Sequence, residues 1–353
     1  MVEIDGSLGE GSGQILRTGL TLSILTRQPL RISNIRLKRK NPGLQPQHLK
    51  AVDAAAAICT ASVNGAALNS TSLMFEPGSI RTGRYRFDIG TAGSTSLVFQ
   101  TVALPLSLAS SASSIIITGG THNPWSPCFH YLSMHWLHFL QRSGLDMSLQ
   151  MELAGFYPQG GGRIISTIRP CKEIRPLVLA GRGKINRIYG VSAVANLDLS
   201  IAKRQKTRAI QRLMSYDPEI KIVTTNMASR FKGTMLLLIG EFFYSGNGYT
   251  QCCYFSLGAL RKPAELVADE AVDEFIYFYA TPAAIDQYLA DQLLLPLSLA
   301  AGESLLHTAR ITSHLLTNAA VIHAFSLARV EITGSLGEPG MIKISPLGRS
   351  YPT

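Results

Sequence analysis

The chain has little of what secreted or zinc-bound proteins use to stabilise themselves. Its 353 residues include only five cysteines, which are Cys59, Cys128, Cys171, Cys252 and Cys253. They form no Cys-x-x-Cys pair, and their odd number includes two adjacent residues. This pattern predicts neither a disulfide framework nor a zinc site. A reducing compartment is therefore expected.

Long apolar runs are also missing. Gln100 breaks one candidate for a membrane-spanning segment and Pro296 breaks another, and a span needs about twenty predominantly apolar residues. The first residues lack the basic start and apolar core of a signal peptide. We therefore expect a cytoplasmic protein without a membrane-spanning segment.

Charged residues are scarce, and their balance is one-sided. They make up 16% of the chain against 46% hydrophobic residues, a composition that supports a large core and argues against disorder. Lys and Arg total 33 against 23 acids, giving a net charge of +10 at pH 7. Such an excess favours polyanionic partners such as RNA, DNA or an acidic membrane surface. A basic enzyme without such a partner fits the composition equally well.

Helical periodicity recurs in pairs of segments. The pairs are 14–25 with 47–59, 94–108 with 127–140, and 284–299 with 314–325. Segments rich in β-branched residues, such as 30–35 and 114–118, lie between or after these helices and predict strands. The fold class expected is therefore α/β.

The spacing of the pairs indicates an interrupted repeat. With Ser12, Gly93 and Ala284 as starting points, the first two pairs are 81 residues apart and the last two are 191 apart. We interpret this as three repeated β/α units, the third interrupted by an inserted domain. The insertion is predicted over 181–273, and 1–180 with 274–353 then form a large domain. An amphipathic stretch at 199–214 and a strand near 234–239 make the insertion α/β as well.

A glycine-rich loop precedes the first predicted helix. Its sequence is Gly-Glu-Gly-Ser-Gly at 9–13, and clustered glycines at a helix start let backbone N–H groups approach phosphate oxygens. No Gly-Lys-Ser/Thr follows, so the loop is not a P-loop, and a tight turn without a ligand is the commoner interpretation. Glu10 could hold a hard divalent metal beside phosphate, and Arg17 could clamp a phosphate oxygen.

A basic block follows at 36–40, where Arg-Leu-Lys-Arg-Lys places four cations in five residues. It ends in a Pro-Gly turn that leads to Gln47. In a chain with so little charge, this density favours phosphate contact as much as a solvated face.

A second glycine-containing loop, Gly-Thr-Ala-Gly-Ser-Thr at 90–95, also resembles an anion cradle in front of a helix. That helix carries Gln100 among apolar neighbours. A lone Gln in such a stripe is more often a core amide than a nucleotide ligand.

His314 has a distinctive local setting. Thr312 or Ser313 is a credible N-cap, which places His314 in the first turn of a helix. The positive helix end disfavours imidazolium, so this imidazole should be neutral near pH 7 with a free lone pair. A nucleophile toward phosphorus requires that state. Local features alone favour a buried or capping His over a catalytic one.

Taken together and in order, these segments resemble the RNA 3′-terminal phosphate cyclase family. The resemblance also includes Gly119-Gly120-Thr121, the segment 155–162 (Gly-Phe-Tyr-Pro-Gln-Gly-Gly-Gly), 288–293 (Tyr-Leu-Ala-Asp-Gln-Leu) and 314–318 (His-Leu-Leu-Thr-Asn). It implies a large domain of three β/α repeats similar to the C-terminal domain of translation initiation factor three. A smaller domain would be inserted in the last repeat.

The resemblance also implies roles for individual residues and substrates. His314 would be adenylylated by ATP, Glu10 would hold a divalent metal (Mg or Mn), and an RNA 3′-phosphate end would become a 2′,3′-cyclic phosphodiester. Phosphates would be contacted by Arg36, Arg39 and Gln47. The adenine nucleotide would be contacted by Arg17, Gln100, Tyr288, Leu289, Ala290, Asp291, Gln292 and Asn318.

One departure and three rival interpretations accompany this resemblance. Many relatives carry an acid near position 130, whereas this chain offers His122 and His130 and no acid between 119 and 140. The cyclase-like ribosome-biogenesis branch lacks the nucleophilic histidine, so His314 argues against it. A non-catalytic RNA-binding protein would rest on the basic block alone. An enolpyruvyl transferase, which uses related β/α repeats, would rest on analogy of fold alone.

Overall fold

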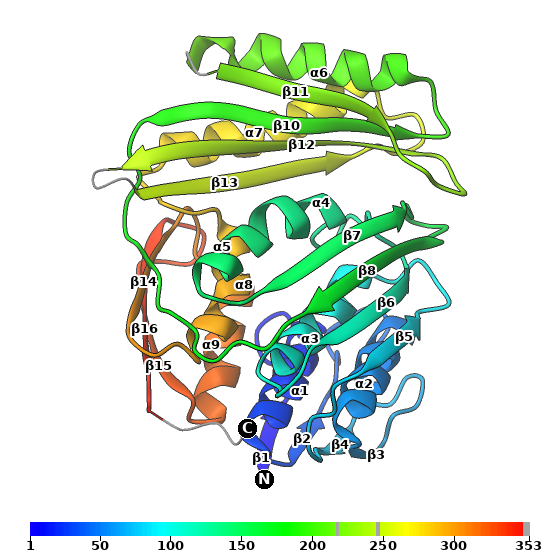
Figure 1. Cartoon of the computed structure of the whole chain (residues 1–353), viewed down its shortest axis with the longest axis vertical. Helices are drawn as coiled ribbons and strands as arrows, with labels where there is room; N and C mark the ends of the chain where they lie inside the picture. The colour runs from blue at the N-terminus through cyan, green and yellow to red at the C-terminus, as the bar shows by residue number, and fades with distance from the viewer. Residues whose placement is uncertain (217–218, 245–247, 349–353) are drawn as a thin grey trace.

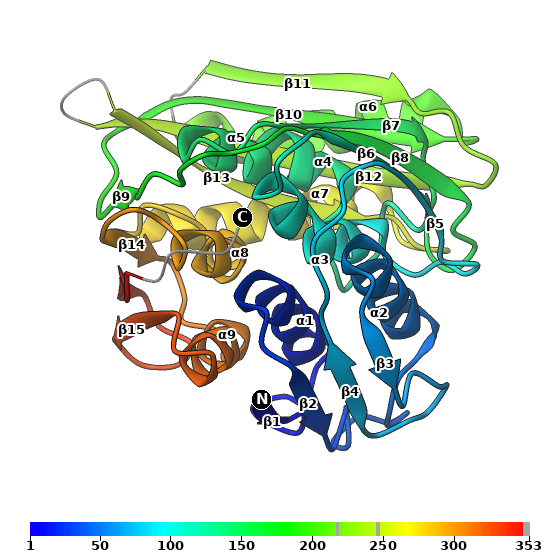
Figure 2. The same ribbon diagram turned by 60° about the horizontal axis from the view of Figure 1, so that its bottom comes forward.

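The computed structural model describes residues 1–216, 219–244 and 248–348 and shows a mixed α/β structure (Figure 1). Its strands form four sheets of four strands each. Three sheets surround a group of packed helices, and the fourth lies along one end of the molecule (Figures 1 and 2). The expected α/β class is confirmed. No helix in the described ranges is long and apolar enough to cross a membrane.

The three surrounding sheets share one strand arrangement. The first contains β1 (Val2–Asp5), β2 (Leu30–Ser33), β4 (Leu73–Glu76) and β3 (Ser62–Asn64), in that order. The second runs β5 (Arg84–Asp88), β6 (Ser113–Gly119), β8 (Gly162–Ile168) and β7 (Met147–Leu153). The third runs β9 (Val178–Leu179), β14 (Ser304–Thr308), β16 (Gly340–Pro346) and β15 (Ala328–Thr333). In each, the first pair is parallel and the next two pairs are antiparallel.

The helices between these strands pack on one another in the interior. They are α1 (Gln14–Thr26), α2 (Pro46–Cys59), α3 (Thr95–Ser107), α8 (Gln287–Leu297) and α9 (Ser313–Ala324). Helix α1 packs against both α3 and α9, so segments far apart in the sequence meet at the centre (Figure 2). Buried alternate residues on the strands, as in β6, face this helical layer.

The helical region predicted over 127–140 is less regular than its periodicity indicates. It begins as α4 (Phe129–Tyr131), passes through a π-helical turn (Leu132–Trp136) and ends as α5 (Leu137–Arg142). The wider π turn inserts one extra residue per turn. It brings His135, which is fully buried, toward α8.

The fourth sheet has a different strand order. It runs β11 (Glu219–Asn226), β10 (Ile185–Ala195), β12 (Gly233–Tyr244) and β13 (Gly248–Leu257). Helices α6 (Leu199–Leu213) and α7 (Ala264–Ala280) cover one face, where Leu236 and Leu238 are buried. Leu237 and Ile239 point to the other face and join the main core of the molecule. Because both faces of β12 are buried, its residues 235–239 are all apolar.

Candidate functional site

A cavity of about 1080 Å³ lies where α1, α3, α8 and α9 approach β13 and α7. Most of the residues predicted for the site line it, although they come from segments spread over the whole chain. These are Glu10, Arg17, Arg36, Arg39, Gln47, Gln100, Tyr288, Asp291, Gln292, His314 and Asn318.

His314 occupies the position expected from its local sequence. Helix α9 begins at Ser313, and the Thr312 hydroxyl oxygen accepts a hydrogen bond of 2.9 Å from the backbone N–H of Leu315. The predicted N-cap is thus confirmed and identified as Thr312. The His314 side chain is half-buried in the cavity wall, with its Nε2 atom 4.0 Å from Glu10 Oε2.

The surroundings of His314 keep its imidazole uncharged. Burial lowers the pKa of His314 below its usual value, and Arg17 and Arg39 lower this pKa further, while Glu10 opposes them. A neutral imidazole at pH 7 retains a lone pair for nucleophilic attack.

The cations of the cavity are held in place by different contacts. Arg39 Nη2 lies 3.1 Å from Glu10 Oε2, and Arg17 Nη2 donates to Gln14 Oε1 at 2.8 Å. Burial lowers the pKa of Arg17 to about 10, so it remains a cation at pH 7. Arg36 Nη1 donates to the carbonyls of residues 41 and 43, which closes the basic loop.

A second group of side chains connects α3 with α8. Gln100 Nε2 donates to Gln292 Oε1 at 2.6 Å, and Gln292 Nε2 donates to the backbone carbonyl of Tyr288 at 2.9 Å. Asp291 accepts a hydrogen bond of 2.6 Å from the Thr312 hydroxyl, which joins α8 to the start of α9. Burial raises the pKa of Asp291 to about 8, so this carboxyl is mostly protonated at pH 7.

Some predicted residues are placed differently from their neighbours. Leu289 and Ala290 are fully buried, because the helical turn of α8 directs them into the core. Side-chain contact between these two and a nucleotide is therefore not supported. Asn318 borders the cavity, yet its oxygen accepts from Gln14 and Thr18 and its amide donates to the Asp291 carbonyl. These hydrogen bonds connect α1, α8 and α9.

The anion cradle predicted at 90–95 is contradicted for three of its backbone donors, those of Gly93, Ser94 and Thr95. The N–H of Ser94 donates to Gln47 Oε1, and the N–H of Thr95 donates to the carbonyl of Gly120. The N–H of Gly93 donates to the Thr91 hydroxyl. Because the protein uses these donors itself, the loop shapes the site by anchoring Gln47.

His122 and His130 form a buried pair outside the cavity lining. Nε2 of His122 lies 3.0 Å from Nδ1 of His130, and the Thr121 hydroxyl lies 2.7 Å from Nδ1 of His122. Burial lowers the pKa of both imidazoles, to about 4 for His130, and His130 lowers that of His122 further. Both are neutral at pH 7, and their contact connects the loop of His122 with α4.

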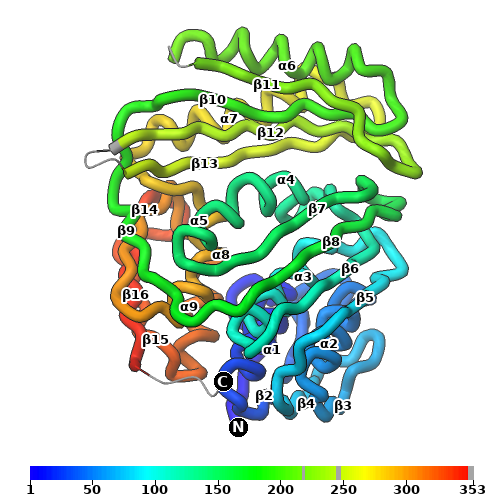
Figure 3. The backbone as a smooth tube through the Cα atoms, viewed as in Figure 1, coloured from blue at the N-terminus to red at the C-terminus, as the bar shows by residue number. Residues whose placement is uncertain are grey.

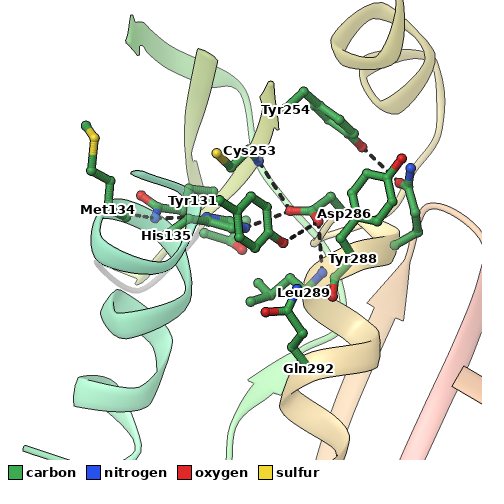
Figure 4. Close-up of polar contacts among 12 residues, drawn as sticks. Tyr131, Met134, His135, Cys253, Tyr254, Asp286, Tyr288, Leu289 and Gln292 are labelled. Carbon is green, nitrogen blue, oxygen red and sulfur yellow. Dashed lines mark hydrogen bonds and ion pairs between the residues drawn. The ribbon is translucent and has the colours of Figure 1, made fainter. Parts of the chain in front are cut away.

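Behind the cavity, Asp286 is the centre of a buried hydrogen-bond network (Figure 4). Its Oδ1 accepts from the Tyr131 hydroxyl and from the N–H of Leu289, both at 2.9 Å. Its Oδ2 accepts from His135 Nε2 at 2.7 Å and from the N–H of Cys253 at 3.2 Å. One carboxylate therefore joins the π-helical region, β13 and the start of α8.

Gln251 orients the histidine of this network. Its amide nitrogen donates to the Met134 carbonyl and to His135 Nδ1, both at 3.1 Å, while its oxygen accepts from the Tyr189 hydroxyl. With Nδ1 as an acceptor, His135 carries its proton on Nε2, which faces Asp286. The network thus places the helix that presents Tyr288 to the cavity.

Several cavity residues were not identified from the sequence. His48 lines the cavity, its Nδ1 accepts from the N–H of Gln45, and burial with nearby Arg17 and Arg36 lowers the pKa of His48 to about 3. Its ring passes so close to Gly13 that a Cβ there would lie 2.5 Å from His48 Nε2.

The opposite wall is formed by residues of β13 and α7 and by the loop between them. They include Tyr254, Ser256, Lys262, Glu270 and Glu274. No motif marks these positions, because they reach the cavity only through the packing of the fourth sheet.

The described residues contain no group of three or more His, Cys, Asp or Glu side chains arranged to hold a metal ion. Glu10 is nevertheless a carboxylate exposed to the cavity beside three arginines. A single carboxylate fits Mg²⁺, which keeps most of its ligands as water and substrate phosphate oxygens.

Three arginines, a carboxylate and a neutral imidazole around one cavity provide what phosphoryl and nucleotidyl transfer require. Such a set of groups suits an enzyme that acts on phosphate groups. The family model described as RNA 3′-terminal phosphate cyclase matches residues 8–332. The chain belongs to the RNA 3′-terminal phosphate cyclase family.

Relatives of this name span nearly the whole chain. The RNA 3′-terminal phosphate cyclase of Nostoc punctiforme is 40% identical over 339 residues, covering 94% of this chain and 96% of the relative. That of Thermococcus kodakarensis is 40% identical over 344 residues, covering 97% and 98%. Among solved structures, the enolpyruvyl transferase NikO from Streptomyces tendae aligns with 61% of this chain and 38% of its own, at 14% identity and a TM-score of 0.29. A likeness that small carries no argument.

Proposed function

We propose that the protein converts an RNA 3′-terminal phosphate into a 2′,3′-cyclic phosphodiester, with ATP as co-substrate and His314 as the adenylylated residue. The observation that carries the proposal is the setting of His314. Its imidazole is kept neutral in the wall of a cationic cavity, in a chain that belongs to the cyclase family.

In the first step, an imidazole nitrogen of His314 attacks the α-phosphorus of ATP. The N–P bond forms, the bond between the α-phosphorus and the bridging oxygen breaks, and pyrophosphate leaves with the bonding electrons. Arg17 and Arg39 face the cavity beside His314 and stabilise the charge that develops on the phosphates. Gln100, Tyr288 and Gln292 would hold the adenine nucleotide on the side of α8.

In the second step, an oxygen of the RNA 3′-phosphate attacks the phosphorus of the adenylyl group, and the bond to His314 breaks. The RNA end then carries AMP in a pyrophosphate linkage. In the third step, the neighbouring 2′-hydroxyl loses its proton and attacks the phosphorus of the RNA 3′-phosphate. The bond from this phosphorus to AMP breaks, and AMP is released. This nucleophile is already in place, so positioning by Arg36, Arg39 and Gln47 supplies much of the acceleration.

Glu10 is the residue that would hold a divalent metal, which neutralises phosphate charge when it is bound. Its position supports this role, since its carboxylate contacts Arg39 and approaches His314 on the cavity side.

We also propose that the fold consists of three repeats with an insertion that begins at 181, as expected from the sequence, and ends with α7 rather than at 273. The shared strand order of three sheets supports the repeats, and the sequence Leu-Pro-Leu-Ser-Leu-Ala occurs at both 104–109 and 295–300. Arg182 supports the insertion, because it donates to the carbonyls of Tyr279, Thr281 and Ala283. The chain would thus leave and re-enter the large domain at neighbouring points, with α7, which ends at Ala280, as the last inserted element.

The test is incubation with ATP labelled at the α-phosphate, followed by denaturing electrophoresis. The protein should take up label as a phosphoramidate, stable to alkali and lost in acid. RNA with a 3′-phosphate should discharge the label, whereas RNA with a 3′-hydroxyl should not.

Variants identify the nucleophile. His314→Asn should stay folded and take up no label, and His307→Asn, on β14, is the matched control that should still label. Normal labelling of His314→Asn would assign the nucleophile elsewhere. A wild type that never labels would be a non-catalytic, RNA-binding member of the family.

A further inference from the structure

Two aromatic side chains at the cavity are unusually exposed. Trp125 is 78% exposed and Tyr157 is 52% exposed, and their ring centroids lie 5.3 Å apart at an interplanar angle of 77°. Trp125 lines the same cavity as His314 and Arg39. Adjoining exposed rings beside a cavity mark a binding surface.

The loops that carry these rings are held in one conformation. The N–H groups of Thr121 and His122 both donate to the Gly155 carbonyl, at 2.8 and 3.0 Å, and the N–H of Tyr157 donates to the His122 carbonyl. The His122 ring also stacks on Phe156 at a centroid distance of 4.7 Å. These contacts join the two loops and favour one arrangement of the exposed rings.

The surface continues onto the turn between β11 and β12. Phe231 is 40% exposed there, between the exposed cations Arg230 and Lys232. Its ring lies against Gly161 in the loop of Tyr157, where a Cβ would come within 3.2 Å of the ring. Neither cation forms an ion pair with another residue in the described ranges.

Exposed rings beside unpaired cations match the chemistry of single-stranded RNA, whose bases stack on aromatic faces while its phosphates attract cations. We propose that Trp125, Tyr157 and Phe231, with Arg230 and Lys232, form a platform for the nucleotides just upstream of the RNA 3′-phosphate. This inference rests on the proposed function. The terminal phosphate lies among the cavity arginines, and the strand leaves the cavity past Trp125 onto the platform.

The kinetic test compares Trp125→Ala and Tyr157→Ala with Trp125→Phe, which keeps an aromatic face. The control is Phe243→Ala, since Phe243 is also 52% exposed but lies at the other end of β12 from Phe231. For a single-stranded RNA decamer with a 3′-phosphate, KM should rise about 5-fold or more in Trp125→Ala and in Tyr157→Ala, as expected for the loss of one stacked base. The kcat should change little, and a dinucleotide 3′-phosphate, too short to reach the platform, should show no such rise.

Trp125→Phe and Phe243→Ala should keep the wild-type KM for the decamer. The KM for ATP, measured by label uptake without RNA, should be unchanged in all four variants. An unchanged decamer KM in Trp125→Ala and Tyr157→Ala would overturn the platform. A rise in the KM for ATP would instead assign the Trp125 ring to adenine.

Fluorescence provides a test that does not depend on turnover. The chain has two tryptophans, and the other, Trp136, is only 5% exposed. Binding of the decamer should quench the emission of Trp125, and Trp125→Phe should abolish the quenching. If the wild type took up no label but the decamer still quenched Trp125, the proposed function would fail and the platform would stand. If label uptake were normal and quenching absent, the platform alone would fail.

Discussion

Replacing Asp286 by Asn should lower the stability of the protein and weaken the attachment of α8, which carries Tyr288 and Gln292 of the cavity wall. Asp286 itself does not line the cavity. The carboxylate accepts two hydrogen bonds at each oxygen, from four donors that are all buried. An Asn amide offers one acceptor and one donor group. Whichever way it turns, its NH₂ group faces two donors of the protein.

The structure sets the size of the effect. A buried donor left without an acceptor costs about 1–3 kcal/mol, so two such donors cost about 2–6 kcal/mol. The lower end applies if His135 moves its proton to Nδ1 and Gln251 turns its amide. Because domain stabilities are about 5–15 kcal/mol, the variant should remain folded near that lower end.

A matched variant separates the network from simple helix capping. Asp198 is the N-cap of α6, where its Oδ1 accepts from the exposed N–H of Ser200 at 2.8 Å. Asn caps helices as well as Asp, so Asp198→Asn should change stability by no more than about 0.5 kcal/mol. Urea unfolding of both variants measures the difference.

The functional consequence follows from the position of α8. When the start of α8 is no longer held by Asp286, Tyr288 and Gln292 should bind the nucleotide less well. The KM for ATP in label uptake should therefore rise in Asp286→Asn and not in Asp198→Asn. Equal losses of stability in the two variants would refute the argument that buried donors around Asp286 hold α8 in place.

Three further outcomes are expected. Because the pKa of His314 is lowered, the acid limb of label uptake, where the imidazole protonates, should have its midpoint below the usual pKa of a histidine, about 6.5; a midpoint at or above pH 6.5 would contradict this. Arg39→Ala should change stability by no more than about 0.5 kcal/mol, weaken turnover of RNA 3′-phosphate and reduce its salt dependence, and unchanged kinetics would make the basic block a solvated face. The raised pKa of Asp291, about 8, means that the folded state keeps a proton that the unfolded state has lost. The contribution of Asp291 to stability should therefore fall between about pH 4 and about pH 8, and the difference in thermal unfolding between Asp291→Asn and the wild type should change over that pH range.

Local periodicity was sufficient to predict most of the interior helices. The segment 14–25 became α1 (Gln14–Thr26), and 47–59 became α2 (Pro46–Cys59). The His314 setting was predictable for the same reason, since an N-cap and a first turn depend on neighbours within a few residues.

Features that depend on distant partners were not predictable. The sequence of 90–95 resembles an anion cradle, but in the fold Gln47 and Gly120 accept hydrogen bonds from its N–H groups. The boundary expected at 273 falls inside α7, a continuous helix that packs on β12 and β13. The far wall of the cavity was missed because β13 reaches it only through packing between sheets.

The two-sided burial of the fourth sheet determines how the cavity is able to respond to a ligand. Swinging this sheet away from α8 would pull Leu237, Ile239 and Cys253 out of the main core, at about 1.5–3 kcal/mol for each large apolar side chain. It would also strip Asp286 of the Cys253 N–H. A hinge motion of the whole fourth sheet is therefore costly, and we expect the cavity walls next to this sheet to stay in place when a nucleotide binds.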